Sequence, residues 1–384
     1  MAGISRVAVI GAGWSGATCA RLLTDRGVRV EVFERAPVVG GHSRAEVLQG
    51  VVYEPNGPHI FHTSDPEVAA FVHRFGLTRP YELHVLTEGF LDEDDDGGVL
   101  LSWPLQVDEL RDLPIWPTVE RELAELPDHP TGDDFPTFVT SIMGPTLYRI
   151  FVDGYTRKQW GCDPAELSAD IANHRVALRH DGDLRTFRDT WEFFPERGVN
   201  EVIERVVASS AVTCNAPMGI GDLEALGREF DAVIITAALD EFVGEGTALE
   251  WRGISVSATF VPTDAPDDTV TPAYLVNRPT LRVAHTRTCE TKHASGQRVS
   301  GTVVGKELPG AAARHYPIST VDHRHERANA ALAKRIRATS SVPVHFVGRL
   351  AQYAYINQDE AIRRAMDLAH TLLDDNGGQR PAPL

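Results

Sequence analysis

The sequence predicts an α/β fold, a Rossmann-like parallel sheet with a helical insertion and an additional antiparallel β-sheet layer. Three observations lead to this prediction. A β-branched run at 6–10 leads through the glycine-rich turn GAGWSG into a helix-like segment and a second strand, VRVEVFER. A mostly helical stretch punctuated by prolines follows from about 106 to 173. Several β-rich runs then lie between 250 and 304.

The elements follow in order along the chain. The apolar positions of ATCARLLTDRG fit a helix that ends at Gly27. HVLTEGFL and VLLSWPLQ predict a hairpin around the turn DEDDDGG, and the nearly continuous apolar run at 230–239 predicts a buried parallel strand. ISVSATFV, LRVAHT and RVSGTVV predict an antiparallel sheet. VHFVG at 344–348 predicts a last buried strand before an amphipathic helix at about 359–373, and NGGQRPAPL predicts a frayed tail.

The length of 384 residues predicts two or three lobes. We expect a Rossmann-like domain from 1–82, 196–245 and 340–384, a helical domain at 100–190 with a mobile loop at about 162–186, and an antiparallel sheet domain at 246–339. The net charge of -17 disfavours non-specific nucleic-acid binding. No apolar run is long enough to predict membrane insertion. The four cysteines show no metal-ligand spacing, so we expect no metal and a reducing, cytoplasmic setting.

The turn GAGWSG predicts a dinucleotide site. Gly11 permits a tight turn, Gly13 lets the backbone approach a pyrophosphate, and Gly16 lets helix and strand pack closely. The helix N-terminus, with Trp14 and Ser15, then faces the phosphates. Further candidate residues are Glu34, whose position suits hydrogen bonds from an adenosine ribose, and the glycine pair Gly40 and Gly41 with the adjacent His42. The alternative is a structural glycine-rich turn.

The second glycine pair favours FAD over NAD as the dinucleotide. Flavoproteins of the amine-oxidase and mutase type use such a pair to approach the pyrophosphate again. Near the C-terminal end, Gly348 follows a predicted strand and would let the backbone come near the flavin, while Arg349 would meet phosphate. The alternative for this segment is a strand-end glycine beside a surface arginine.

Four motifs resemble those of the UDP-galactopyranose mutases in their order and approximate positions. They are GPHIFHT at 57–63, YTRKQWG at 155–161, TR followed by ExKH at 286–293, and GRLAQYAYIN at 348–357. The match covers most of the chain. It implies an isomerase that interconverts pyranose and furanose forms of a nucleotide-linked sugar and acts as a homodimer. It also implies that N5 of reduced FAD attacks the anomeric carbon without net redox change.

The resemblance also implies roles for individual residues. It places His59 and Ile60 beside the flavin, and Tyr355, Ile356 and Asn357 at the cofactor. It assigns the nucleotide base to an aromatic stripe and the diphosphate to arginines and tyrosines. The stripe is Phe151, Tyr155, Thr156 and Trp160, and the remaining substrate residues are Asn277, Arg287, Arg349, Tyr316 and Tyr355. Read without the family, the histidines and the aromatic stripe would be core or capping residues, and the arginines would form surface salt bridges.

The sequence departs from the family on the substrate side. The family's PVR tripeptide, whose arginine closes on the diphosphate, is absent from HRVALRHDGDLRTF. Arg179 is the best counterpart if one residue has been inserted, and Arg175 and Arg185 remain open. Thr186 and Asn56 stand where the family has tyrosines. Two other readings therefore stay open, an FAD-dependent oxidase or dehydrogenase of the amine-oxidase type and a non-catalytic FAD-binding scaffold.

Overall fold

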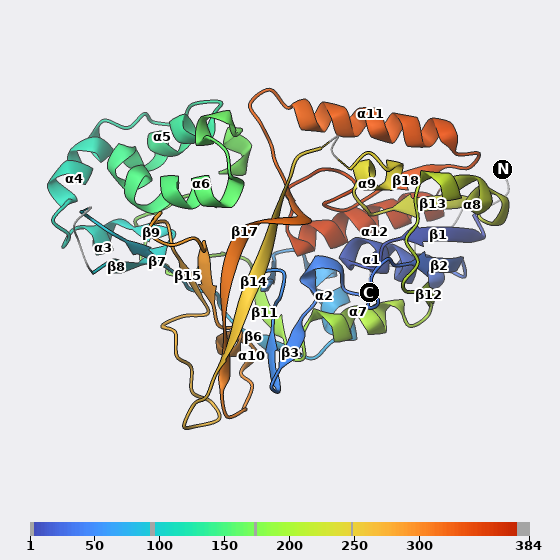
Figure 1. Ribbon diagram of the computed structural model, residues 1–384, viewed down its shortest axis with the longest axis horizontal. Helices are drawn as coiled ribbons and strands as arrows, with labels where there is room; N and C mark the ends of the chain where they lie inside the picture. Colours follow the sequence, from blue (N-terminus) through green and yellow to red (C-terminus); the bar gives the residue numbers. More distant parts are fainter. Residues whose placement is uncertain (1–3, 93–96, 173–174, 247–248, 375–384) are drawn as a thin grey trace.

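Two lobes lie on either side of a pair of long strands (Figure 1). The computed structural model describes residues 4–92, 97–172, 175–246 and 249–374. The long strands are β14 (Trp251–Val261) and β17 (Thr302–Pro317), which pair antiparallel. The predicted tail at 376–384 lies outside the described residues. Within the described ranges, no helix has both the length and the apolar character needed to cross a membrane.

The first lobe is built on a five-stranded parallel sheet with the order β12, β2, β1, β13, β18. Its strands are β1 (Arg6–Ile10), β2 (Arg29–Phe33), β12 (Ala211–Thr213), β13 (Ala232–Ile235) and β18 (Val344–Phe346). The predicted βαβ unit and the predicted buried strand β13 are therefore confirmed; the predicted last strand is present as β18, in which Val344 is buried and His345 and Phe346 are half-buried. Because parallel strands need crossover connections, helices cover both faces of this sheet.

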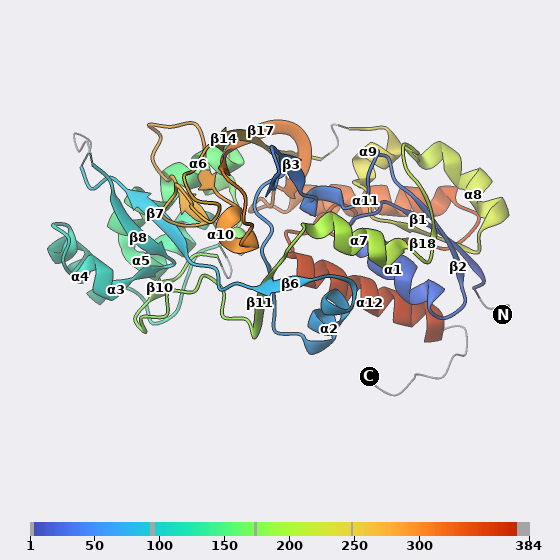
Figure 2. The ribbon, with the colours of Figure 1, turned by 90° about the horizontal axis from the view of Figure 1, so that it is seen from below.

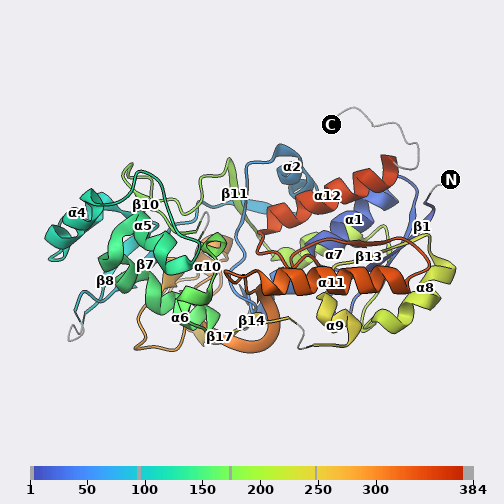
Figure 3. The same cartoon turned by 90° about the horizontal axis from the view of Figure 1, so that it is seen from above.

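Alternate side chains of β1 point to opposite faces of the sheet, and a different set of helices packs on each face. Val7 and Val9 pack against α1 (Trp14–Thr24), α7 (Val199–Val207) and α12 (Gln358–Asp374). Ala8 and Ile10 face the opposite way, because successive strand side chains point to opposite faces. They pack with α8 (Leu223–Glu229), α9 (Leu239–Val243) and α11 (Arg324–Thr339). Helix α11, within the expected sheet domain of 246–339, thus packs on the parallel sheet and lies lengthwise across this lobe in Figure 3.

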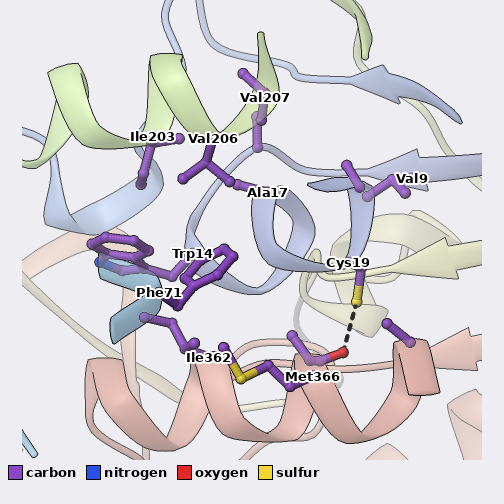
Figure 4. Close-up of a cluster of buried hydrophobic side chains, with 14 of the residues drawn as sticks. Val9, Trp14, Ala17, Cys19, Phe71, Ile203, Val206, Val207, Ile362 and Met366 are labelled. Carbon is purple, nitrogen blue, oxygen red and sulfur yellow. Dashed lines mark hydrogen bonds between the residues drawn. The ribbon is translucent and has the colours of Figure 1, made fainter. Parts of the chain in front are cut away.

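Helix α1 lies at the centre of the first core, between α7 and α12 (Figure 4). Ala17 faces Ile203 and Val206 of α7, while Cys19 faces α12. The Cys19 thiol donates to the Ala365 carbonyl over 3.5 Å. Helix α2 (Pro66–Phe75) closes this core with Phe71. This packing fixes the N-terminus of α1, which is the end that faces the predicted dinucleotide.

The second lobe has its own core and contains the predicted helical insertion. Its helices are α3 (Val107–Leu110), α4 (Trp116–Ala124), α5 (Phe135–Tyr148), the π-helix η2 (Arg149–Asp153) and α6 (Gly154–Trp160). Proline positions explain several boundaries, since Pro117 and Pro136 lie in first turns, where a missing N–H is tolerated. Pro145 follows a kink at Gly144, whose φ is +80°.

A six-stranded sheet joins the second lobe to the long strands, in the order β14, β17, β16, β15, β7, β8. The shorter strands are β7 (Val85–Gly89), β8 (Val99–Trp103), β15 (Leu275–Asn277) and β16 (Arg287–Cys289). The predicted hairpin is confirmed by the antiparallel pair β7 and β8, although residues 93–96 of its turn lie outside the described residues. Strand β15 pairs parallel with β7, so this sheet is mixed rather than antiparallel throughout.

The strand predicted for LRVAHT at 281–286 is wrong. Residues 281–286 form turns and bends, and the strand begins only at Arg287. The physical reason is Lys158 of α6, whose ammonium donates to the carbonyls of Arg278, Thr280, Val283 and His285 over 2.5 to 3.2 Å. The backbone curls around this cation instead of extending, because an ammonium that is partly removed from water requires several acceptors.

Smaller elements complete the structure (Figure 2). Strand β11 (Trp191–Pro195) pairs with β5 (Phe61–Thr63) and β6 (Thr78–Pro80), β3 (Glu46–Leu48) with β4 (Val51–Tyr53), and β9 (Leu105–Gln106) with β10 (Leu178–Arg179). The short helices are η1 (Gly41–Ser43), η3 (Pro164–Glu166), η4 (Ala169–Ile171), η5 (Ile220–Asp222) and α10 (Lys292–Ser295). The predicted mobile loop at 162–186 contains η3, η4 and β10, and its residues 173–174 lie outside the described residues.

Candidate functional site

The glycine-rich turn joins β1 to α1, and its three glycines differ in what surrounds them. Gly11 has φ +104°, and a Cβ there would lie 2.2 Å from Thr236 Oγ1. A Cβ on Gly16 would lie 1.9 Å from the Gly11 carbonyl oxygen. A Cβ on Gly13 would meet only the Gly41 Cα, at 3.7 Å. Protein packing therefore requires Gly11 and Gly16, while Gly13 leaves exposed backbone where a phosphate can approach the helix N-terminus.

A second turn faces the first one across Gly13. Gly40 has φ +118°, and its N–H donates to the Ala12 carbonyl over 2.9 Å. The buried Glu34 carboxylate accepts the Ala12 N–H at 2.7 Å and the Ala36 N–H at 2.8 Å, one on each oxygen. Each oxygen keeps a second lone pair that can accept a ribose hydroxyl. Glu34 thus holds the two turns together and remains available to a ligand.

A third segment reaches the same place from the C-terminal part of the chain. Gly348 follows β18 with φ +96°, and a Cβ there would lie 2.6 Å from Ser15 Oγ. The two turns and this segment enclose a cavity of about 510 Å³. The predicted cofactor residues that line it are Gly11, Gly13, Trp14, Ser15, Glu34, Gly40, Gly41, His42, His59, Gly348, Arg349, Ile356 and Asn357. Gly16, Ile60 and Tyr355 are predicted residues that do not line it.

Gln358 connects the N-terminus of α1 to the loop that carries His59. The Trp14 indole Nε1 donates to Gln358 Oε1 over 2.6 Å. The Gln358 amide donates in turn to the carbonyls of His59 at 3.0 Å and Ile60 at 3.2 Å. Ile60 is itself buried in a neighbouring core. The first residue of α12 therefore positions the loop beside the cavity, and no motif in the sequence indicated this role.

His59 lies in a half-buried turn whose hydrogen bonds set its tautomer. Burial lowers the pKa of His59 to about 3, and the nearby Arg349 guanidinium acts in the same direction. The neutral ring places Nδ1 2.5 Å from the Gly57 carbonyl, so Nδ1 donates and Nε2 is left as an acceptor. The His59 N–H donates to Glu54 Oε1 over 2.8 Å. At neutral pH the ring is therefore an uncharged group at the cavity wall.

Arg287 lies at the centre of the substrate-side residues. Its Nε donates to the Tyr155 hydroxyl over 2.7 Å and lies 3.8 Å from Glu307 Oε1. Burial alone would lower the pKa of Arg287, but the fully buried Glu307 carboxylate raises it well above its usual value. Asn277 stands directly opposite Arg287 in the ladder of β15 and β16. The structure thus brings together three predicted substrate residues and one carboxylate that was not predicted.

Arg349 joins the cofactor cavity to the aromatic residues of the second lobe. Its Nε donates to the Ile356 carbonyl over 3.0 Å, and Nη1 donates to the His315 carbonyl over 3.3 Å. The guanidinium carbon lies 5.3 Å from the ring centre of Tyr316 and 5.6 Å from that of Tyr355. Burial lowers the pKa of Arg349, although the guanidinium remains protonated in proteins. Its positive charge is therefore close both to the cofactor cavity and to the aromatic residues of the second lobe.

The predicted aromatic stripe divides into two pairs. Trp160 lies edge-on to Tyr355 with ring centres 5.6 Å apart, and Tyr155 contacts the arginine cluster. Phe151 is 3% exposed and packs against β7, while the Thr156 hydroxyl donates to a carbonyl one turn earlier in the helix. Phe151 and Thr156 thus fill the core of the second lobe, and their proposed contact with a nucleotide base stays a prediction.

The three loop arginines occupy different places. Arg179 donates to the carbonyls of Asp183 at 3.3 Å and Thr186 at 3.0 Å, and also to the Arg185 carbonyl. Arg185 pairs with Asp183 over 2.8 Å. Arg175 instead lies with its guanidinium carbon 3.8 Å from the ring centre of Tyr355 and donates to the Asn357 amide oxygen over 3.2 Å. Of the three, the structure places Arg175 at the site.

Four residues at the site were missed in the sequence, namely Gln358, Glu54, Glu307 and His315. The two carboxylates are fully or almost fully buried, yet glutamate is common on surfaces and its burial leaves no local signal. His315 directly precedes Tyr316 on β17, and the alternation of buried and exposed positions along the strand was the only indication that His315 is buried. Gln358 directly follows the motif GRLAQYAYIN, so its position was a weak signal.

Comparison with known proteins identifies the same family as the sequence motifs do. A family model described as UDP-galactopyranose mutase matches residues 150–355, more than half of the chain, and an NAD(P)-binding Rossmann-like domain model matches residues 9–75. The dTDP-fucopyranose mutase of Escherichia coli is 25% identical and covers 97% of this chain and 100% of its own length. The probable UDP-galactopyranose mutase of Klebsiella pneumoniae is 26% identical, with 98% and 97% covered.

Solved structures show the same fold at lower identity. The crystal structure of a reduced UDP-galactopyranose mutase superposes with a TM-score of 0.73 at 14% identity and covers 96% of this chain and 94% of that one. A putative protoporphyrinogen oxidase from Exiguobacterium follows with a TM-score of 0.64 at 10% identity and covers 98% and 100%. The oxidase is thus the more distant neighbour. The motifs, the cavity with its arginine cluster and the family match together place this chain in the UDP-galactopyranose mutase family.

Proposed function

We propose that this protein interconverts the pyranose and furanose forms of a nucleotide-linked sugar, with FAD in its reduced form and no net redox change. One observation carries the proposal. Arg349 lines the dinucleotide cavity and also contacts Tyr316 and Tyr355, next to the Arg287 cluster. A cofactor and a diphosphate bound at these two places would meet at Arg349. The names of the relatives, mutases of UDP-galactopyranose and dTDP-fucopyranose, support a nucleotide sugar as the substrate.

The residues at the cavity suit FAD. The open backbone at Gly13 and the N-terminus of α1 would receive the pyrophosphate, and the free lone pairs of Glu34 would receive the ribose hydroxyls. When bound in its reduced form, the flavin supplies an electron-rich N5 that can act as a nucleophile. The neutral His59 and the Gln358 amide would hold the adjacent loop in place.

The arginine cluster suits the leaving diphosphate. Arg287 and Arg349 are permanently charged and half-buried, and their attraction for a developing negative charge is stronger there than in open water. The hydroxyls of Tyr155, Tyr316 and Tyr355 would add hydrogen bonds. Burial raises the pKa of Tyr155 and of Tyr316 above the usual tyrosine value, so both hydroxyls keep their protons and can donate. A loop arginine would complete the clamp.

We further propose that the protein acts as a homodimer in the cytoplasm. The family resemblance supports the dimer. The four free cysteines, which show no disulfide, support a reducing compartment. Light scattering of the purified protein would report a mass near twice 42.1 kDa for the dimer. A mass of one chain at micromolar concentration would contradict it.

The decisive experiment compares the dithionite-reduced and oxidised protein with UDP-galactopyranose and dTDP-fucopyranose as probe substrates. The mutase should turn over only when reduced, and it should consume no stoichiometric reductant, because the flavin is regenerated in each cycle. Activity of the oxidised protein with stoichiometric peroxide release would favour an oxidase. Bound FAD without affinity for any nucleoside diphosphate would leave a non-catalytic scaffold.

A further inference from the structure

The loop of residues 278–286 connects two residues that belong to the substrate side. Asn277 is the last residue of β15 and Arg287 is the first of β16, and the two stand opposite each other in the ladder. The Arg278 N–H donates to the Thr286 carbonyl over 2.8 Å and closes the loop at its base. Because Asn277 and Arg287 are joined directly to this loop, a shift of the loop moves both of them.

Lys158 of α6 joins the two arms of the 278–286 loop. Its ammonium donates to the carbonyls of Arg278 and Thr280 on the arm that leaves β15. It also donates to those of Val283 and His285 on the arm that leads to β16, so three N–H groups share four acceptors. Burial and the nearby Arg278 guanidinium lower the pKa of Lys158 to about 8, and the side chain is still charged at pH 7. The ammonium therefore cross-links the arms through their backbone.

Helix α6 contacts the same loop at a second point. A Cβ on Gly154 would lie 2.1 Å from the Pro279 carbonyl oxygen, so the missing side chain lets the helix approach the loop closely. Gly154 and Lys158 are four positions apart and lie on one face of α6. Tyr155 of this helix accepts a hydrogen bond from Arg287 Nε at 2.7 Å. One short helix thus holds both the loop and the arginine that follows it.

We propose that Lys158 is a positioning residue for the substrate, which holds the 278–286 loop on α6 so that Arg287 stays in place to bind the diphosphate. This inference rests on the proposed function, because the diphosphate is the group that Arg287 would hold. Lys158 acts through backbone carbonyls and not through a contact with the substrate. Since it does not line the cofactor cavity, its loss should weaken substrate binding and leave FAD binding unchanged.

The test compares the purified wild type with Lys158→Ala at pH 7. The variant lacks the ammonium and leaves four carbonyls without their donor, so the loop should lose its fixed conformation. UDP and dTDP should bind about tenfold more weakly, as expected for one lost charge-assisted hydrogen bond from Arg287, and isothermal titration measures this. The KM for UDP-galactopyranose should rise in parallel, while the flavin absorbance of the variant equals that of the wild type.

Chemical rescue distinguishes the ammonium from the bulk of the side chain. n-Propylammonium has the three carbons and the nitrogen that Lys158→Ala lacks, so it should restore most of the UDP affinity. Tetramethylammonium at the same concentration controls for ionic strength, because it has no N–H to donate. Lys158→Met keeps a long side chain without the charge, and it should lose UDP affinity and leave no space for rescue by the amine.

A matched control is Lys292→Ala on α10. The Lys292 ammonium also donates to backbone carbonyls, those of Asp268, Val299 and Gly301, over 2.8 to 2.9 Å. The segments that carry these carbonyls contain none of the predicted substrate residues. Lys292→Ala should therefore unfold at a lower temperature and still bind UDP as the wild type does. This result would separate a general loss of stability from a loss of positioning.

The inference is overturned if Lys158→Ala keeps the wild-type affinity for UDP and dTDP, or if n-propylammonium and tetramethylammonium have the same effect on it. If Lys158→Ala does not fold, Gly154→Ala tests the same contact, because its Cβ would push the Pro279 carbonyl away from α6. Its UDP affinity should fall with FAD still bound, and an unchanged affinity has the same meaning as above. A wild-type protein that binds neither UDP nor dTDP would instead contradict the proposed function, so the two failures are distinguishable.

Discussion

The two half-buried arginines of the site are neutralised to different degrees. Arg287 lies 3.8 Å from the fully buried Glu307 carboxylate, whereas Arg349 contacts two carbonyls and two tyrosine rings. Carbonyl dipoles satisfy a guanidinium without cancelling its charge. We therefore expect Arg349 to contribute more net positive potential to a bound diphosphate than Arg287 does.

The loop arginines lead to a prediction about the substrate clamp. Arg175 already lies on the ring of Tyr355 and donates to Asn357, so we expect its guanidinium to reach the bound diphosphate. Arg175→Ala should then remove charge-assisted hydrogen bonds to the diphosphate of about 1.5 to 3 kcal/mol. That corresponds to about a tenfold to hundredfold loss in kcat/KM, with unchanged FAD binding. Steady-state kinetics of the reduced enzyme would measure it.

Arg179→Ala and Arg185→Ala are the comparison variants for the uncertain register. The resemblance of this loop to the family's, with one residue inserted, favours Arg179, and this stays a prediction. It requires Arg179 to leave the carbonyls of Asp183, Arg185 and Thr186 when the loop closes. If Arg179→Ala alone loses turnover, the loop rearranges in that way. Wild-type kinetics in all three variants would show that the diphosphate is held elsewhere.

Glu54 leads to a prediction about stability and pH. Burial raises the pKa of this carboxyl to about 7, although hydrogen bonds from Tyr274, His59 and Thr291 oppose the shift. Between about pH 4.5 and pH 7 the folded protein therefore holds a proton that the unfolded chain has lost. The contribution of Glu54 to stability is complete below pH 4.5 and declines as pH rises through this window, by up to about 3 kcal/mol.

Urea unfolding of the wild type and Glu54→Gln at several pH values between 4.5 and 8 would check this. The free energy of unfolding of the wild type should fall relative to the variant as pH rises, because glutamine does not ionise. Above about pH 7.5 the difference should be constant. A difference independent of pH across the whole window would mean that Glu54 is ionised throughout.

At the scale of elements, two glycines of the strand–turn–helix unit at the N-terminal end have different roles, one in packing and one in leaving space for a ligand. Gly16 is required by the packing of α1 on the turn, whereas Gly13 faces an opening in the protein. One position therefore serves the fold and the other serves the ligand. The motif alone does not distinguish these two glycines, but the structure shows that only Gly16 is needed for packing.

This difference predicts opposite results for two substitutions. Gly16→Ala should destabilise the protein by about 3 kcal/mol, because its Cβ would lie 1.9 Å from a carbonyl oxygen, which outweighs the better helix propensity of alanine. Gly13→Val should fold with nearly wild-type stability yet purify without yellow colour, because its side chain fills the approach of the pyrophosphate. Thermal unfolding and visible absorbance would measure both. A Gly13→Val protein with full FAD occupancy would contradict the cofactor assignment.

At the scale of the whole molecule, the cavity is assembled from parts of the chain that are distant in sequence. Its lining comes from residues 10–44, from His59, from 216–242 and from 348–361. These residues lie at the ends of β1 and β2, at the start of α1, in η1 and α9, at the start of α12 and in the loops between them. Opening any of these elements would open the cavity, so the cofactor and the fold of the first lobe should be stabilised together.

The protein should consequently unfold at a higher temperature when FAD is present. With FAD in excess over its dissociation constant, each tenfold increase in free FAD should add about 1.4 kcal/mol to the free energy of unfolding. Differential scanning calorimetry across a series of FAD concentrations would show this rise. Free riboflavin, which lacks the pyrophosphate and adenosine, serves as the control ligand and should give a much smaller shift.

The sequence by itself determined the parallel sheet, the glycine-rich turn between β1 and α1, and the family. These features depend on local patterns, such as β-branched runs, glycine spacing and short motifs, whose physical causes act within a few residues. Through the resemblance it also assigned Arg287, Asn277 and Tyr155 to the substrate side, and in the structure Arg287 donates to the Tyr155 hydroxyl and stands opposite Asn277.

Only the tertiary structure decided the features that depend on burial and on distant contacts. The run LRVAHT has the composition of a strand, but Lys158, more than 120 residues earlier, draws its carbonyls into a loop. The stack of His42 on His315 and the burial of Glu54 likewise have no local signal. The pKa and the hydrogen bonding of an imidazole or a carboxyl are set by the groups that surround it in space, and the local sequence does not show which groups those are.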